Sequence, residues 1–169
     1  MQTPLETTFL QLLHSNQDRI YRVCRSYAPD HQAAQDLFQE TVLQLWKSLA
    51  TFRGEAQLQT WVYRVTLNVC LQARLRYQND QKRTRHLDSI QFLNLPQETP
   101  DPATEERLKA LHHCIQKLND SDRSLVLLYL EDLPYREIAT VTGLTENHVA
   151  VKMKRIREKL FTCLSPALC

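Results

Sequence analysis

Glycine is almost absent from this chain of 169 residues, which contains only two. Segments that alternate strictly between apolar and polar residues, as half-buried β-strands do, are also few. Instead, apolar residues recur at steps of three and four over long segments, which is the pattern of amphipathic helices. The shortage of glycine and of strand patterns therefore excludes a β-rich fold and predicts an all-α protein.

Cysteine is present, but without the close spacing that metal sites use. The five cysteines are scattered and form no CxxC pair: Cys24, Cys70, Cys114, Cys163 and Cys169. This scatter favours reduced thiols over a disulfide framework or a zinc site, and no redox role is expected for the two C-terminal cysteines. His112 and His113 adjoin Cys114, but consecutive helical residues point in different directions, so no metal and no cofactor is predicted.

Long apolar runs and catalytic motifs are missing as well. The longest apolar run, residues 125–130, is far too short to cross a bilayer. The N-terminus has neither the basic start nor the apolar core of a signal peptide, so a cytoplasmic protein without membrane insertion is expected. No nucleophile–base pair, carboxylate pair, phosphate-binding glycine loop or metal-ligand spacing is present, which argues against an enzyme.

The charge of the chain is nearly balanced, with a formal net charge of +2, so composition alone does not indicate a nucleic-acid partner. The distribution of charge is more informative. Residues 145–160 contain five lysines and arginines against two glutamates. Any basic surface that binds nucleic acid must therefore be local.

This basic segment belongs to a predicted helix-turn-helix over residues 133–160. Pro134 suits the start of the first helix, and Gly143 supplies the backbone freedom needed just past its end. Thr145 is a good N-cap for the second helix. One face of that second helix is apolar: Val149, Met153, Ile156 and Leu160. In a DNA-binding motif of this kind, the second helix enters the major groove.

Polar residues at the start of the second helix strengthen the DNA interpretation. Asn147 and His148 stand where recognition helices touch base edges, and the cations that follow would lie near phosphates. For the motif taken alone, the alternative is a helical hairpin whose charges only keep the protein soluble. The motif by itself indicates a DNA-binding module without showing its kind.

The N-terminal half contains three predicted helices. They begin near residues 5, 30 and 60 and end near residues 27, 49 and 77. In the third helix, Trp61 and Tyr63 are interleaved with cations and amides, a combination that suits stacking on unpaired bases beside a phosphate backbone. The alternative is that these aromatic residues pack in the core.

Between the two halves the composition changes. A polar, basic segment is followed by three prolines, which at this density favour extended chain: Pro96, Pro100 and Pro102. A second helical unit is expected to begin near Glu105, with Leu108 among its packed residues. The chain therefore divides into a first domain, a linker and a second domain, over residues 1–79, 80–105 and 106–169.

In this order, the segments resemble a bacterial RNA polymerase sigma factor of the extracytoplasmic-function (ECF) group of the sigma-70 family. Residues 36–46 resemble the family's region 2.2, and residues 60–68 resemble its region 2.4. Residues 118–123, 135–139 and 145–160 together resemble region 4. The resemblance covers nearly the whole chain. It implies two small helical domains, region 2 and region 4, joined by a flexible linker.

The resemblance also implies a function. A sigma factor binds core RNA polymerase, directs it to particular promoters and helps to open the DNA, while the polymerase supplies the chemistry. The expected partners are therefore promoter DNA and core polymerase, through its β′ clamp helices and its β flap. Many members of the group are also held inactive by an anti-sigma factor.

Position by position, the resemblance assigns three sets of residues. Those expected to bind the β′ clamp helices are Asp36, Gln39, Glu40 and Leu43. Those expected at the −10 element, where a loop captures a flipped base, are Phe52, Arg53, Gly54, Glu55, Arg64, Asn68, Gln72, Arg74 and Arg76. Those expected to face the −35 element are Glu146, Asn147, His148, Lys152, Lys154 and Arg155.

The recognition helix departs from the family at three positions. Ala150 and Val151 stand where Lys-Ser is common, and His148 replaces a small hydroxyl residue. The resemblance therefore indicates where DNA lies but not which promoter sequence is bound. Two other interpretations stay open: an operator-binding helix-turn-helix regulator with an N-terminal sensor or dimerisation domain, and a helical interaction protein without a DNA role.

Overall fold

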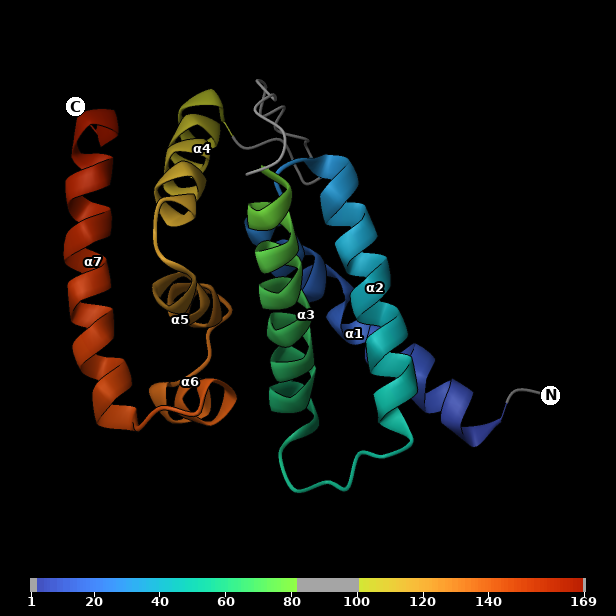
Figure 1. The fold of residues 1–169 in the computed structure, drawn as a ribbon. Coiled ribbons are helices and arrows are strands. Elements are labelled where there is room, and N and C mark those ends of the chain that lie inside the picture. Colours follow the sequence, from blue (N-terminus) through green and yellow to red (C-terminus); the bar gives the residue numbers. More distant parts are fainter. Residues whose placement is uncertain (1–2, 82–100, 169) are drawn as a thin grey trace. The chain divides into compact units, whose positions relative to one another are not determined.

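The computed structural model describes residues 3–81 and 101–168, and every regular element in these two stretches is an α-helix. The helices form two compact units, one with three helices and one with four (Figure 1). The predicted all-α fold is thereby confirmed. Residues 82–100, which make up most of the predicted linker, lie outside the described residues. Across the two described stretches, no helix combines the length and the apolar character needed to span a membrane.

The first helix, α1 (Pro4–Tyr27), begins at a complete capping box. The Thr3 hydroxyl accepts a hydrogen bond from the Glu6 backbone N–H, and the Glu6 carboxylate accepts one from the Thr3 N–H at 2.8 Å. Pro4 follows at the first helical turn, where its missing N–H is not needed. One face of α1 is buried: Phe9, Leu12, Ile20, Val23, Cys24 and Tyr27.

Helices α2 (His31–Leu49) and α3 (Leu58–Gln81) complete the N-terminal unit, and each of the three helices contacts the other two. Asp30 caps α2, because its carboxylate accepts a hydrogen bond from the Ala33 N–H at 2.8 Å. This cap explains why the chain can turn within three residues between α1 and α2.

Small side chains form the centre of this three-helix unit. The Cys24 Sγ of α1 lies 3.7 Å from the Thr41 Oγ1 of α2 and 3.9 Å from the Cys70 Sγ of α3. Cys24 and Cys70 are both free thiols and almost inaccessible to solvent. Burial, followed by the neighbouring Cys24, raises the pKa of the Cys70 thiol well above its ordinary value. These thiols therefore act as small core residues.

The C-terminal unit consists of α4 (Pro102–Gln116), α5 (Asp120–Leu130), α6 (Tyr135–Thr142) and α7 (Glu146–Leu168). Helix α7, drawn in red in Figure 1, contacts each of the other three. Its predicted apolar face is buried, and α5 and α6 add further core residues: Leu125, Leu128, Ile138, Val149, Met153, Ile156 and Leu160. Burial of side chains of this size stabilises the fold by roughly 1.5–3 kcal/mol each. Because α7 contributes four of these residues and contacts every other helix of the unit, it is the unit's central element.

The start of α4 differs from the predicted boundary. The helix begins at Pro102 rather than near Glu105, so the last residues of the predicted linker are helical. Asp101 caps the helix, because its carboxylate accepts a hydrogen bond from the Ala103 N–H, which lowers the pKa of Asp101. Pro102 starts this helix instead of preventing one, since the first helical position needs no N–H. Leu108, which was expected to pack, is 54% exposed.

The expectation of five reduced cysteines is wrong for one pair. Cys114 in α4 and Cys163 in α7 form a disulfide, and their Cα atoms are 5.9 Å apart. The two residues are separated by 49 positions, so no local spacing rule indicates that they meet. They meet because α4 and α7 pack against each other.

Candidate protein and nucleic-acid interfaces

Helix α2 presents a continuous exposed stripe, which we call the α2 stripe. Its members follow one another at steps of three, one and three, which places them on one face of the helix: Asp36, Gln39, Glu40 and Leu43. All four side chains are exposed, and Leu43 exposes 58% of its surface. The structure thus brings together all the residues that the resemblance assigned to polymerase.

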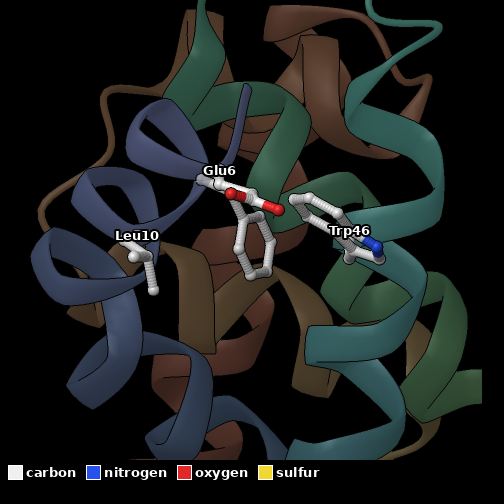
Figure 2. A pocket seen from close by; sticks show the side chains of 4 residues that line it. Glu6, Leu10 and Trp46 are labelled. Carbon is white, nitrogen blue, oxygen red and sulfur yellow. The ribbon is translucent and has the colours of Figure 1, made fainter. Parts of the chain in front are cut away.

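An apolar hollow continues from this stripe. It is lined by Glu6, Phe9 and Leu10 of α1 and by Trp46 of α2, and in Figure 2 the Glu6 side chain extends toward Trp46. The Phe9 ring meets the Trp46 indole edge-on, with the ring centroids 5.0 Å apart. Trp46 lies one turn after Leu43 and is 37% exposed. Apolar surface therefore extends from the stripe to α1, which favours a protein partner over a polar ligand.

The loop between α2 and α3 is held by an aromatic contact. Phe52 is half-buried, and its ring centroid lies 5.1 Å from that of Trp61 on α3. Gly54 has a φ of +72°, in the left-handed region that favours glycine. Arg53 and Glu55 flank this glycine and are exposed. The loop therefore presents opposite charges beside an aromatic pair, which is chemistry that can stack on a base and bond its edges.

Helix α3 carries a second stripe, the α3 stripe, whose members are exposed and follow one another at steps of four: Arg64, Asn68, Gln72 and Arg76. Arg74 is half-buried and lies off this stripe, because two residues correspond to about 200° of rotation around a helix. Tyr63 is only 2% exposed, so the core interpretation holds for its ring. Trp61 is half-buried, so part of its side chain is accessible.

The helix-turn-helix forms as predicted. Helix α6 ends at Gly143, whose φ of +74° is left-handed, and the Thr145 hydroxyl accepts a hydrogen bond from the His148 N–H at 3.2 Å. Five of the six residues predicted to face the −35 element are exposed on the first three turns of α7: Glu146, Asn147, His148, Lys154 and Arg155. The turn therefore presents the start of α7 to solvent as an accessible polar and basic surface.

Lys152, the sixth residue, is engaged within the unit. Its ammonium donates a hydrogen bond to the Ser121 hydroxyl at 2.9 Å and lies 3.4 Å from one carboxylate oxygen of Asp122. Lys159 binds the other oxygen of Asp122 at 2.7 Å. Burial raises the pKa of Asp122, but the hydrogen bond and the charges of the two lysines outweigh it and hold that pKa below its ordinary value. The start of α5 thus fastens α7 through one buried carboxylate.

A cluster of two tyrosines and one arginine was not predicted. Arg157 of α7 donates a hydrogen bond to the Tyr135 hydroxyl of α6 at 3.1 Å, and its guanidinium lies 5.0 Å from the ring centroid of Tyr129 on α5. The two tyrosine rings are 6.2 Å apart. The three residues come from three helices, so their proximity leaves no signal in the sequence. Arg157 therefore braces the helix-turn-helix rather than extending freely toward a ligand.

Among the described residues, no group of three histidine, cysteine or acidic side chains is arranged to hold a metal ion. In the only adjacent cluster that the sequence offered, His112 pairs with Gln116 at 3.1 Å and Cys114 is part of the disulfide.

Comparison with known proteins identifies the family of this chain. Residues 12–80 match the family Sigma-70 region 2, and residues 108–160 match Sigma-70, region 4. The RNA polymerase sigma-H factor of Pseudomonas aeruginosa is 30% identical over 163 residues, which cover 90% of this chain and 83% of that relative. This chain belongs to the sigma-70 family of RNA polymerase sigma factors.

Other relatives place this sigma factor in the ECF group. It is 24% identical to the ECF RNA polymerase sigma-E factor of Salmonella typhimurium, over 96% of this chain and 90% of the relative. Its fold is similar to that of the sigma factor RpoE from Bartonella quintana, solved in complex with the anti-sigma factor NepR. That match has a TM-score of 0.73 at 19% identity and covers 94% of this chain and 97% of the other. CnrH, solved in complex with the cytosolic domain of CnrY, matches with a TM-score of 0.67 at 22% identity, over 94% of this chain and 88% of that one.

Family membership establishes the class of activity. The protein is an ECF sigma factor, a non-enzymatic subunit that binds core RNA polymerase and directs transcription initiation. Both alternatives that the sequence left open, the operator-binding regulator and the interaction protein without a DNA role, are thereby set aside. The predicted helix-turn-helix lies within the matched region 4.

Proposed function

We propose that this sigma factor uses three separate surfaces for three tasks. The α2 stripe binds the β′ clamp helices of core polymerase, the α2–α3 loop with the α3 stripe binds the −10 element, and the first turns of α7 bind the −35 element. One observation carries the proposal: nearly all the assigned residues are exposed, either on helices whose other faces are buried or on the α2–α3 loop. Region 2 corresponds to residues 1–79 and region 4 to residues 106–169, to which the first turn of α4 is added.

The α2 stripe has the composition of a protein interface. Leu43 and the neighbouring Trp46 offer apolar surface, while Asp36, Gln39 and Glu40 surround it with groups that hydrogen-bond or pair with cations. Interfaces typically combine an apolar centre with a polar rim. A partner that is basic and partly apolar would therefore complement this stripe, and the clamp helices are the partner that we assign to it.

The α2–α3 loop suits capture of an unpaired base. Extrusion of a base from the stack costs a few kcal/mol, so a pocket that holds it stabilises the opened DNA. Phe52 and Trp61 supply an aromatic platform, and Asn68 on the adjoining stripe can bond a base edge. Arg64 and Arg76 are spaced along α3 so that they can follow the phosphate backbone.

The first turns of α7 suit readout of duplex DNA. Asn147 and His148 can bond base edges, and Lys154 and Arg155 can neutralise phosphates. Because Lys152 is already bound to Ser121 and Asp122, we assign it a smaller share of phosphate binding than Arg155.

We further propose that the protein acts in the cytoplasm, beside the polymerase, and that region 4 also contacts the β flap. An anti-sigma factor is a proposed regulator, supported by the structural likeness to RpoE, which was solved with the anti-sigma factor NepR. The exposed apolar surface of Leu43 and Trp46 is available to such a protein as well. Polymerase and inhibitor would then compete for α2.

Binding to sigma-free core polymerase tests the α2 assignment. The purified protein should co-elute with core polymerase in size exclusion, and Gln39→Ala combined with Leu43→Ala should lower the affinity at least tenfold, or about 1.4 kcal/mol. Gln17→Ala, at an exposed position of α1, is the matched control and should bind normally. Circular dichroism verifies that each variant is folded. Undiminished binding by the double variant would remove the α2 stripe from the interface.

A further inference from the structure

The Cys114–Cys163 disulfide closes a loop that contains the whole helix-turn-helix. The two cysteines are 49 positions apart, and the segment between them includes α5, α6 and α7 up to Cys163. Beyond Leu160, none of the residues 161–167 is buried. The bond therefore fastens the last turns of α7 to α4 at a place where core packing does not.

A disulfide can contribute a large share of the stability of a unit as small as this one. Residues 101–168 form a small four-helix unit, and a single core in so short a segment leaves little margin of stability. A disulfide stabilises a protein mainly by restricting the unfolded chain, and the effect grows with the length of the closed loop. Here the closed loop includes the helix that carries all the residues assigned to the −35 element.

We propose that Cys114 and Cys163 form a reversible thiol-oxidation site, in which oxidation stabilises the helix-turn-helix and reduction loosens it. In the cytoplasm, reductants keep most thiols reduced, so a disulfide there is usually transient and redox-sensing. The stability effect stands on the geometry alone. Its consequence for promoter binding rests on the proposed −35 function of α7.

The oxidant is a low-molecular-weight disulfide such as oxidised glutathione. Cys163 is half-buried and Cys114 is only 4% exposed, so Cys163 reacts first. Its thiolate attacks one sulfur of the small disulfide, forms a mixed disulfide and releases one small thiol. The Cys114 thiolate then attacks the Cys163 sulfur and releases the second small thiol. Two protein thiols are oxidised, one small disulfide is reduced, and the two thiol protons leave on the two small thiols.

The other buried pair provides an internal comparison. Cys24 and Cys70 also lie close, with their Sγ atoms 3.9 Å apart, but both are almost inaccessible. Since the thiolate is the reactive species, burial protects this pair from exchange. Oxidation should therefore link Cys114 to Cys163 and leave Cys24 and Cys70 as free thiols.

The first experiment maps the thiols of the full-length protein. The protein is treated with oxidised glutathione or dithiothreitol, unfolded, alkylated and digested for mass spectrometry. We expect a linked Cys114–Cys163 peptide only after oxidation, and alkylated Cys24 and Cys70 under both conditions. Cys163→Ser should abolish the link, whereas Cys169→Ser, which removes a neighbouring cysteine outside the pair, should leave it intact. Alkylation of both Cys114 and Cys163 after oxidation would overturn the proposal.

Hydrogen exchange then measures the consequence. Amides of α5, α6 and α7 that open only by unfolding of the whole unit should exchange on the order of 100-fold more slowly in the oxidised protein. Amides of α1 to α3 are the control and should be unaffected. Reduced wild-type protein supplies the form without the disulfide, so the comparison does not depend on whether a serine variant folds. Equal exchange rates in the oxidised and the reduced protein would overturn the proposal. If oxidation slows exchange but neither form binds −35 DNA, the thiol-oxidation site is supported and the −35 assignment of α7 is rejected.

Discussion

Arg76 of α3 forms an ion pair with Glu40 of α2, in which one guanidinium nitrogen lies 2.8 Å and 3.1 Å from the two carboxylate oxygens. The pair joins the α2 stripe, assigned to polymerase, to the α3 stripe, assigned to promoter DNA. The side chains are 58% and 46% exposed. Exposed ion pairs contribute only about 0–1 kcal/mol, so either partner can be exchanged for a new one. Binding of Glu40 to polymerase would therefore release Arg76 for a phosphate.

If Arg76 exchanges Glu40 for a phosphate, its removal should affect DNA binding and polymerase binding differently. Arg76→Ala should lower the affinity of the holoenzyme for promoter DNA, because a phosphate contact is lost. It should leave the affinity for core polymerase unchanged or slightly higher, because no ion pair with Arg76 then has to break before Glu40 binds polymerase. Fluorescence anisotropy with labelled protein measures core binding, and labelled promoter DNA measures the second step.

A double-mutant cycle provides the control for this pair. Glu40→Ala, Arg76→Ala and the double variant should give a coupling of less than about 1 kcal/mol in the free energy of unfolding. A larger coupling would mean that the pair is structural and is not readily exchanged. Weaker core binding by Arg76→Ala would likewise contradict the exchange.

Two arginines of α7 should differ in the salt dependence of promoter binding. Both arginines are exposed, but only Arg157 is bonded to Tyr135 and lies against Tyr129. Arg155→Ala should therefore reduce the slope of log affinity against log salt by about one. Arg157→Ala should leave that slope unchanged and instead lower the free energy of unfolding by about 1 kcal/mol. The same charge is removed from the same helix, so each variant is the control for the other, and equal slopes would reject the assignment.

Asp122 predicts a pH-dependent stability of region 4. Its folded pKa lies below the ordinary value of 3.8, because Lys159 and Lys152 outweigh the effect of burial. A carboxyl with a lowered pKa stabilises the fold at every pH above its unfolded value and loses this contribution as the pH falls through the folded value. Asp122→Asn should thus lower the free energy of unfolding by about 1–3 kcal/mol at neutral pH.

The acid range provides the check for Asp122. Denaturant unfolding of wild type and Asp122→Asn should give a constant difference above the ordinary carboxyl pKa and a shrinking one below it. Asp120→Asn, at a more exposed position of the same first turn of α5, is the matched control and should have a smaller effect. A difference that stays constant into strong acid would exclude the ion pair as its cause.

Local patterns in the sequence predicted the helices and their exposed faces. The apolar face of α7 and its Thr145 cap follow from residue spacing, and both are confirmed. Helical periodicity also explains why the members of the α2 stripe share a face, although their assignment to polymerase comes from the resemblance.

Contacts between distant segments could not be predicted from the sequence. The Cys114–Cys163 bond, the bracing of Arg157 and the fastening of Lys152 to Asp122 each join different helices of one unit. No periodic signal encodes them, since they depend on how helices pack. The start of α4 was misplaced for another reason: Pro102 was interpreted as a helix breaker, although proline is favoured in the first turn.

The turn of the helix-turn-helix offers a test of backbone geometry. Gly143 has a φ of +74°, and a Cβ added there would meet no atom within 4 Å, so any penalty must come from the backbone. Gly143→Ala should therefore destabilise region 4 by about 1–2 kcal/mol, and Gly143→Asn by less, because asparagine tolerates this conformation better. Gly54→Ala, in the equally open loop of region 2, should leave region 4 unchanged. Hydrogen exchange of α6 and α7 separates the two units, and equal stability of the alanine and asparagine variants would contradict a left-handed turn at Gly143.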